Sequence, residues 1–403
     1  GTDVTSSTSG DQIMSRAIGN RGGVWRGVVT DHGSIIPSDG SAELSWHVAA
    51  DDRWYTPQNE PSLRQKWYAG FPVSETRIRI PNGDMVQRVY CVADLGGMTV
   101  IEFENESTLP VAIAVTRSDV FTTRAPAENP PQGIDLPAGS IVLPVGHKST
   151  VRIALAHTSP HAGRLPEDTP THQQVVRGWE AACDVASRVT VPDHTVVAGV
   201  ARLRSDILLG VSSEDVAIEL ARLGETHHDS IVDVVESVQR LLKKEKRSKV
   251  LAWDTPHQLA AAARACVLLG DDVAAGDIGA SWLRMADREV EELPVEAPTD
   301  LSLIAWTETL LAQASPSGGH CALLPYGIPE TWWGAPFDAR GLTADPHRTI
   351  AYAVRWHGAR PAVLWEVTGA PGLLISGGRA DMNWHTADAS GEALLEAPIS
   401  SHV

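Results

Sequence analysis

Cysteine is scarce in this sequence. The 403 residues include four cysteines, which are far apart and form no Cys-x-x-Cys pattern: Cys91, Cys183, Cys266 and Cys321. A disulfide framework or a zinc site needs ligands that are more closely clustered. We therefore expect four free, buried thiols, no metal, no cofactor and a reducing compartment, which favours the cytoplasm.

Positive charge and long apolar runs are also lacking. Lys and Arg number 33 against 50 Asp and Glu, which gives a formal net charge of −17. Such a surface repels phosphate backbones and anionic lipid, so nucleic acid and membranes are not expected partners. No stretch approaches the about 18 apolar residues of a membrane span. The polar N-terminus lacks the regions of a signal peptide, and residues 1–19 are predicted to form a disordered leader.

Two catalytic signatures are absent. The sequence contains no glycine-rich phosphate loop of either standard spacing and no Gly-x-Ser-x-Gly nucleophile elbow. Nucleotide chemistry and serine hydrolysis are therefore disfavoured. The adjacent His227 and His228 point in different directions if they lie on a helix, so we do not expect them to share a metal ion.

The first part of the chain alternates polar and apolar residues with period two. Residues 75–80, 89–93 and 98–104 show the pattern, and Asn82-Gly83 between two such runs predicts a hairpin turn. Short alternating runs separated by turn residues are typical of an antiparallel sandwich. We predict a β-sandwich domain over residues 20–158.

The period then changes to that of helices and later returns. After a linker over residues 159–170, about seven helices are predicted within an α-helical domain at 171–316, and a β-rich segment follows at 317–403. Asp193 is a predicted N-cap, and Thr255 followed by Pro256 predicts another helix start. The predicted helices at the two ends of this domain cover residues 171–188 and 300–314. The fold class is multidomain α+β.

Several strings resemble actinobacterial proteins of the glycoside hydrolase type: Val176–Glu180 (VRGWE), residues 353–358 (AVRWHG), 360–366 (RPAVLWE) and 391–395 (GEALL). The order of parts is similar to inverting glycoside hydrolases and phosphorylases with an N-terminal β-sandwich, an (α/α)6 barrel of six-hairpin glycosidase type and a small β-domain. The helical part is short for that group, which implies a partial barrel or a bundle. The resemblance implies hydrolysis of an oligosaccharide or glucoside, or a non-catalytic relative that binds a carbohydrate or a protein.

Inverting hydrolysis needs two carboxyl groups, roughly 6.5–9.5 Å apart, one to protonate the leaving group and one to activate water. The candidates are Asp254, which precedes a predicted helix, and Glu330, on a loop rich in proline, glycine and tryptophan. Trp253 beside Asp254 is a candidate stacking residue for a sugar ring. Alternatively, Asp254 only caps the helix.

Thirteen tryptophans against four Phe and five Tyr also suit carbohydrate binding, although large rings equally fill the seams between domains. The candidate substrate-binding residues are Trp54, Trp253, Trp332, Trp333, Trp384 and His385. Each has a structural alternative: Trp332 and Trp333 fix the loop of Glu330 to the core, and Trp54 belongs to an ordinary sheet edge. The oligomeric state is left open.

Overall fold

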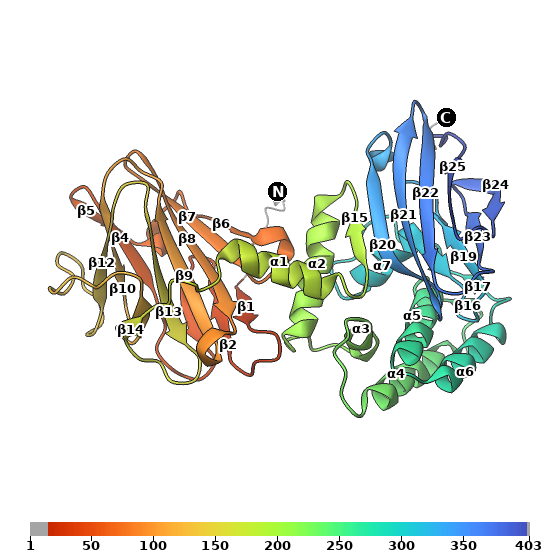
Figure 1. Ribbon diagram of the computed structural model, residues 1–403, viewed down its shortest axis with the longest axis horizontal. Helices are drawn as coiled ribbons and strands as arrows, with labels where there is room; N and C mark the ends of the chain where they lie inside the picture. Colours follow the sequence, from red (N-terminus) through yellow and green to blue (C-terminus); the bar gives the residue numbers. More distant parts are fainter. Residues whose placement is uncertain (1–14, 401–403) are drawn as a thin grey trace, which may run out of the picture. The chain divides into compact units, whose positions relative to one another are not determined.

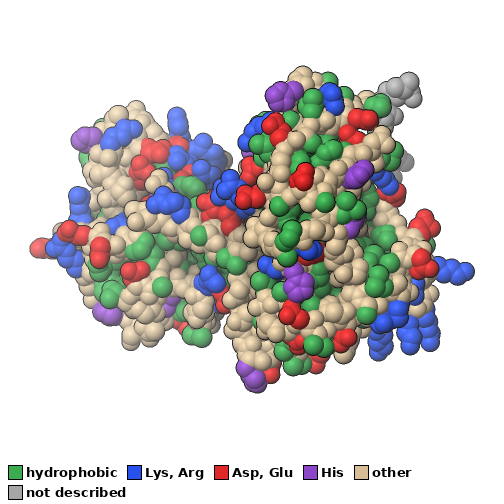
Figure 2. Space-filling view, turned by 45° about the vertical axis from the view of Figure 1, so that its right-hand side comes forward, with side chains coloured by type: hydrophobic (Ala, Val, Ile, Leu, Met, Phe, Trp, Pro, Cys, Tyr) green, Lys and Arg blue, Asp and Glu red, His purple; other side chains and the backbone are tan. Residues whose placement is uncertain are grey.

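The computed structural model describes residues 15–400 and contains two compact units, residues 1–179 and 180–403. Each unit is described by itself. Within the described residues the fold is multidomain α+β with seven α-helices and mostly antiparallel sheets, as predicted (Figure 1). Acidic and basic side chains are interspersed over the visible face in the space-filling view (Figure 2).

The first unit contains a seven-stranded sheet, a four-stranded sheet and a small three-stranded sheet. The seven-stranded sheet has the order β14-β11-β13-β9-β8-β7-β6 and is antiparallel except where β11 meets β14. Its strands are β6 (Arg64–Trp67), β7 (Ser74–Ile80), β8 (Gly83–Val92), β9 (Met98–Asn105), β11 (Phe121–Thr122), β13 (Thr150–Ala156) and β14 (Gly163–Arg164). The four-stranded sheet consists of β12 (Ile141–Val145), β10 (Val111–Val115), β4 (Trp46–Ala50) and β5 (Arg53–Tyr55). The small sheet consists of β1 (Arg16–Gly19), β2 (Arg26–Val29) and β3 (Ile35–Pro37).

The period-two pattern accounts for the core of this unit. Alternate residues of the two larger sheets enter one apolar cluster, in which Trp46 of β4 and Phe103 of β9 lie with ring centroids 5.6 Å apart. The predicted hairpin is confirmed, because β7 and β8 pair antiparallel on either side of Asn82, whose φ is 63°. Of the predicted leader, residues 1–14 lie outside the described range, while Arg16–Gly19 forms β1.

The second unit combines six helices with three sheets, after α1 (His172–Cys183), which spans the division between the units. The helices are α2 (His194–Leu208), α3 (Ala217–Arg222), α4 (Ser230–Glu245), α5 (Thr255–Leu268), α6 (Asp272–Leu283) and α7 (Ser302–Leu311). A second apolar cluster joins α3, α4, α5 and α6. The predicted N-cap is confirmed, since the Asp193 side chain accepts hydrogen bonds from Thr195 N and Val196 N.

The strands of the second unit come mostly from its C-terminal part. The five-stranded sheet has the order β15 (Arg188–Thr190), β20 (Phe337–Asp345), β21 (Arg348–His357), β22 (Arg360–Thr368) and β25 (Ser390–Leu394). The four-stranded sheet consists of β18 (Ala312–Ala314), β19 (His320–Leu323), β23 (Leu374–Gly377) and β24 (Asp381–Thr386). The two-stranded sheet pairs β16 (Val250–Leu251) with β17 (Glu289–Val290).

Two predicted helices end earlier than expected. The helix predicted over 171–188 ends at Cys183, and Arg188–Thr190 forms β15, which pairs with β20. The helix predicted over 300–314 ends at Leu311, and the next three residues form β18. Both errors have one physical cause: partner strands far away in the sequence recruit residues whose local pattern also fits a helix. The predicted helical domain and C-terminal β segment thus share sheets.

The four cysteines are free and buried, as predicted. Within residues 15–400, no helix combines the length and the apolar character that crossing a membrane requires.

Candidate ligand-binding pocket

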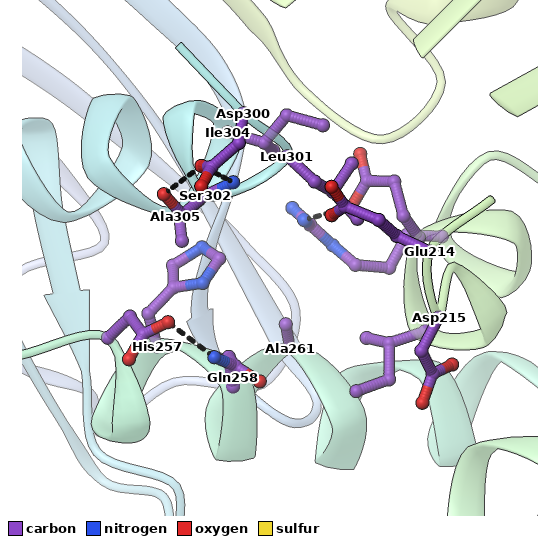
Figure 3. A pocket seen from close by; sticks show the side chains of 14 residues that line it. Glu214, Asp215, His257, Gln258, Ala261, Asp300, Leu301, Ser302, Ile304 and Ala305 are labelled. Atoms are coloured by element: carbon purple, nitrogen blue, oxygen red, sulfur yellow. Dashed lines mark hydrogen bonds and ion pairs between the residues drawn. The ribbon is translucent and has the colours of Figure 1, made fainter. Parts of the chain in front are cut away.

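A cavity of about 320 Å³ lies among the segment before α3 and the N-terminal ends of α5 and α7. Figure 3 shows Glu214 and Asp215 on one side of it and His257, Gln258 and Asp300 on the other. Aliphatic side chains, including those of Ile218, Leu301 and Ile304, complete the wall. The pocket therefore combines carboxyl, amide and hydroxyl groups with apolar surface. All of these residues belong to the second unit.

Local sequence explains why Asp254 reaches this pocket. Asp254 is the residue before α5, and Pro256 occupies the first turn, where its missing N–H costs no helical hydrogen bond. The Asp254 side chain makes no capping hydrogen bond. Its Oδ2 instead accepts a hydrogen bond of 2.5 Å from Nε2 of Gln258, one turn along α5. The carboxyl group thus lines the pocket and does not cap the helix.

A buried set of polar and charged side chains forms part of the pocket wall and joins four helices. Arg204 of α2 contacts Glu219 of α3 at 2.8 Å and Glu308 of α7 at 2.9 Å. Arg222 of α3 contacts the same two carboxylates at 2.8 and 2.9 Å. Nε2 of His257 lies 2.7 Å from Oε2 of Glu308. We call these five residues the buried ion cluster.

The buried ion cluster balances its own charge. The side chains of Arg204, Arg222 and Glu308 are only 3%, 2% and 5% exposed, and water therefore screens them little. Burial alone would raise the pKa of Glu308, but Arg222, His257 and Arg204 outweigh burial and hold that pKa well below its usual range. Two guanidinium groups therefore face two carboxylates, and the floor of the pocket is fixed.

The orientation of His257 follows from this arrangement. Because Glu308 is ionised, its Oε2 accepts a hydrogen bond from the Nε2–H group of His257. The other ring nitrogen is Nδ1, which is an acceptor only in the neutral form of the ring. No partner for this buried Nδ1 is present among the described residues. His257 is thus held in one orientation at the edge of the pocket.

The structure does not bring the two predicted catalytic carboxyls into one cavity. Asp254 lines the pocket described above, whereas Glu330 lines a separate pocket of about 210 Å³. Trp333, Tyr326 and Arg379 line that second pocket together with Glu330. Of the candidates that the sequence analysis places on this loop, the second pocket therefore contains Glu330 and Trp333 but not Trp332.

The remaining predicted substrate-binding residues are dispersed. Trp253 is half-buried and is not part of either pocket's lining, and Trp332 is 3% exposed, with its ring edge-on to Phe337. Trp384 packs edge-on against Trp365, and His385 is exposed on β24. Trp54 belongs to the other unit, where its indole N–H donates to the carbonyl of Gln132.

Metal binding is not favoured by the described residues. His227 and His228 lie in the loop before α4 with exposed side chains. In the described part of the chain, no three His, Cys, Asp or Glu side chains are grouped so that they could hold a metal ion.

The residues that shape the pocket most strongly were not predicted from the sequence, although one of them left a signal. Arg204 interrupts the series Val196, Val200 and Leu208, whose spacing of four residues marks the buried stripe of α2. A charged residue on such a stripe must be paired or must lie at a site. Glu308 similarly lies within an apolar helix. The sequence does not reveal which partners these charges have.

No protein-family model matches this sequence, and no curated protein matches it either. The resemblance to glycoside hydrolases therefore stays a prediction.

Proposed function

We propose that this protein is glycoside hydrolase-like and binds a small saccharide in the pocket among α3, α5 and α7. The observation that carries the proposal is the mixed lining of a cavity of about 320 Å³. Sites for small ligands are concave, have volumes of roughly 300–1,000 Å³ and place a few polar groups within apolar walls. A saccharide matches such a lining because its hydroxyls need polar partners while its C–H faces pack on apolar side chains.

The scaffold supports the proposal at the level of layout. The two large sheets of the first unit share one apolar core, as in the N-terminal β-sandwich of the glycosidases that the sequence resembles. The helices α2–α7 and the C-terminal strands take the places of a shortened α/α domain and the closing β-domain. We propose this arrangement, a carbohydrate partner and a cytoplasmic location together. Fold analogy alone does not carry function, so the pocket has to be tested directly.

Hydrolysis is the second candidate function, and one observation favours it. Asp254, Glu214 and Asp300 come from three different segments and line the same cavity. In an inverting reaction one carboxyl gives its proton to the glycosidic oxygen as that bond breaks. The other takes a proton from the water that attacks the anomeric carbon. In this proposal Asp254 keeps its predicted role, and its partner comes from this pocket in place of Glu330.

The test is binding of mono- and disaccharides to the full chain by calorimetry. Asp254→Asn should weaken binding, because a carboxylate bonded to sugar hydroxyls is replaced by an uncharged amide. Glu330→Gln is the matched control, since Glu330 lines the other pocket. Loss of binding in Glu330→Gln with full binding in Asp254→Asn would move the site to that other pocket. No binding of any saccharide would reject the proposal.

Catalysis is tested separately with aryl glycosides. A carboxyl that acts as general acid or base contributes roughly 10²–10⁴-fold to the rate. Asp254→Asn should therefore lower kcat by about that factor if hydrolysis occurs. Binding without measurable hydrolysis in the wild type would support the non-catalytic alternative.

A further inference from the structure

Most side-chain donors that line the pocket already make internal hydrogen bonds. Both terminal nitrogens of Arg222 donate to carboxylates, Nη1 to Glu219 and Nη2 to Glu308. The amide nitrogen of Gln258 donates to Asp254. The hydroxyl of Ser302 donates to Asp300. A ligand that enters the pocket therefore meets few side-chain donors that are still open.

The acceptors, in contrast, are open. The Glu214 carboxylate has no hydrogen bond or ion pair within residues 15–400. One oxygen of Asp254 and one of Asp300 accept internal hydrogen bonds, and the other oxygen of each has no partner in the same range. The buried Nδ1 of His257 has no hydrogen-bond partner in this range either. The polar groups that the pocket offers to a ligand are thus mainly acceptors.

The charge of the pocket leads to the same conclusion as its hydrogen bonds. The buried ion cluster is balanced, since two arginines face two glutamates. In the described part of the chain, Glu214, Asp254 and Asp300 form no ion pair with a basic side chain. Glu214 and Asp300 are exposed and Asp254 is half-buried, so three negative charges without a basic partner among the described residues surround the mouth and wall of the cavity.

We infer that the ligand of this pocket carries a protonated amine, so that its class is an amino sugar or a similar polyhydroxylated amine. This inference rests on the proposed saccharide site. An ammonium group has three donors and no acceptor, which is the complement of the open groups in the pocket. A neutral hydroxyl also brings acceptor lone pairs, for which few open side-chain donors remain. Anionic sugars are disfavoured by repulsion.

An organic cation fits these observations better than a metal ion. Within residues 15–400, no three candidate ligand side chains are grouped so that they could coordinate one ion. The cavity of about 320 Å³ is also far larger than a single ion needs, and its aliphatic wall contains Ile218, Leu301 and Ile304. Such a wall packs against carbon and adds nothing to metal coordination.

The first experiment compares matched probes by calorimetry on the full chain: glucosamine, galactosamine and mannosamine, their neutral parent sugars, N-acetylglucosamine and cyclohexylamine. At least one amino sugar should bind about tenfold or more tightly than its neutral parent, the factor that 1.4 kcal/mol provides. Acetylation of the amine should remove this gain in affinity, because it removes the positive charge of the amino sugar. Added salt should weaken the binding of the amino sugar more than the binding of its neutral parent.

The outcomes separate the inference from the proposed function. Equal affinity for amino sugars and their neutral parents would overturn the inference and leave the saccharide site in place. Binding of cyclohexylamine as tight as that of glucosamine, with no neutral sugar bound, would support the amine and reject the saccharide. Failure of every amine to bind would overturn the inference.

Two variants test whether the preference for amino sugars arises in the pocket. Glu214→Gln should weaken amino-sugar binding by about tenfold and change neutral-sugar binding much less. Asp277→Asn is the control, because Asp277 is exposed on α6, lies outside the lining of the pocket and changes the net charge equally. Equal losses in both variants would show that the affinity follows the overall charge of the protein, which would overturn the inference.

Discussion

Replacing one carboxylate of the buried ion cluster tests whether its charges stabilise the second unit as a set. Glu308 of α7 accepts from Arg204, Arg222 and the hydroxyl of Ser187, and its second oxygen also lies beside His257. Glu308→Gln keeps the shape of the side chain and removes its charge. Two buried guanidinium groups then face one carboxylate, Glu219.

The expected loss follows from burial. Breaking a buried ion pair by removing one partner costs about 3–5 kcal/mol, because the other charge stays buried without compensation. No reduction for solvent screening applies here, since Arg222 and Glu308 are 2% and 5% exposed. Domains are stable by only about 5–15 kcal/mol, so this loss is a large part of the total.

The assay is urea unfolding followed by hydrogen exchange, because hydrogen exchange reports separately on the two compact units of the chain. Peptides from α2, α3, α5 and α7 report on the second unit, and peptides from β8 and β9 report on the first. With an m-value of about 2–3 kcal/mol/M, Glu308→Gln should lower the midpoint of the second unit by about 1–2 M. The first unit should be unaffected.

A double-mutant cycle tests directly whether the charges of Arg222 and Glu308 compensate each other. Arg222→Met alone leaves one carboxylate in excess, whereas Arg222→Met with Glu308→Gln leaves Arg204 paired with Glu219. The double variant should therefore be less destabilised than the sum of the two single variants, by at least about 1 kcal/mol. Additive losses would refute the reasoning, because they would show that the two charges do not compensate each other.

Three further predictions concern other parts of the chain. Burial and the charge of a nearby arginine lower the pKa of His157 from 6.5 to about 4, so unfolding releases the imidazole to take up a proton. The free energy of unfolding should be at its full value above pH 6.5 and fall by about 2 kcal/mol towards pH 4 on account of this ring, a value already reduced for solvent screening because the ring is half-buried. In a pH series of urea unfolding, the fall in His157→Gln should be smaller by this amount, because burial also lowers the pKa of His47 and that residue still contributes. A Cβ at Gly83 would lie 2.6 Å from backbone, whereas one at Gly276 of α6 meets nothing within 4 Å. Gly83→Ala should therefore cost about 1–3 kcal/mol and Gly276→Ala should gain about 0.5–1 kcal/mol in thermal unfolding. Burial raises the thiol pKa of Cys91 and Cys321 to about 12, so neither should react with a disulfide reagent at pH 8 until urea unfolds the protein.

The sequence allowed the element types to be predicted where local pattern and tertiary context agree. The hairpin at Asn82 and the start of α5 at Thr255 are such cases, because turn chemistry and capping act within a few residues. The strand Arg188–Thr190 is the opposite case. Its identity depends on β20, about 150 residues later, and local periodicity contains no information on that partner.

The candidate site was predictable only in fragments, for a related reason. Asp254 was predicted because a helix start makes an acidic residue visible in the sequence. His257, one turn later, gained its importance only from Glu308 on another helix, at 2.7 Å. Charges that compensate each other across three helices form a relation between distant residues. One sequence shows each charge but not the pairing, and the pairing decides which acceptors stay open for a ligand.

The adjacent residues Trp332 and Trp333 also show that the sequence does not reveal tertiary partners, and they provide a final test. The sequence treats them alike, but Trp332 is 3% exposed and packs edge-on against Phe337 at 5.2 Å. Trp333 is half-buried, lines the second pocket and donates its indole N–H to the carbonyl of Ile328. One ring is therefore part of the core, and the other is in reach of a ligand.

Trp332→Ala should cost about 3–5 kcal/mol in urea unfolding, the range for removing a buried aromatic side chain. Trp333→Ala should cost clearly less, because part of that ring already faces solvent and about 1 kcal/mol of the loss comes from its single hydrogen bond. If saccharides also bind at the second pocket, only Trp333→Ala should reduce that binding while the fold persists. Equal destabilisation by the two substitutions would contradict the difference in burial on which this distinction depends.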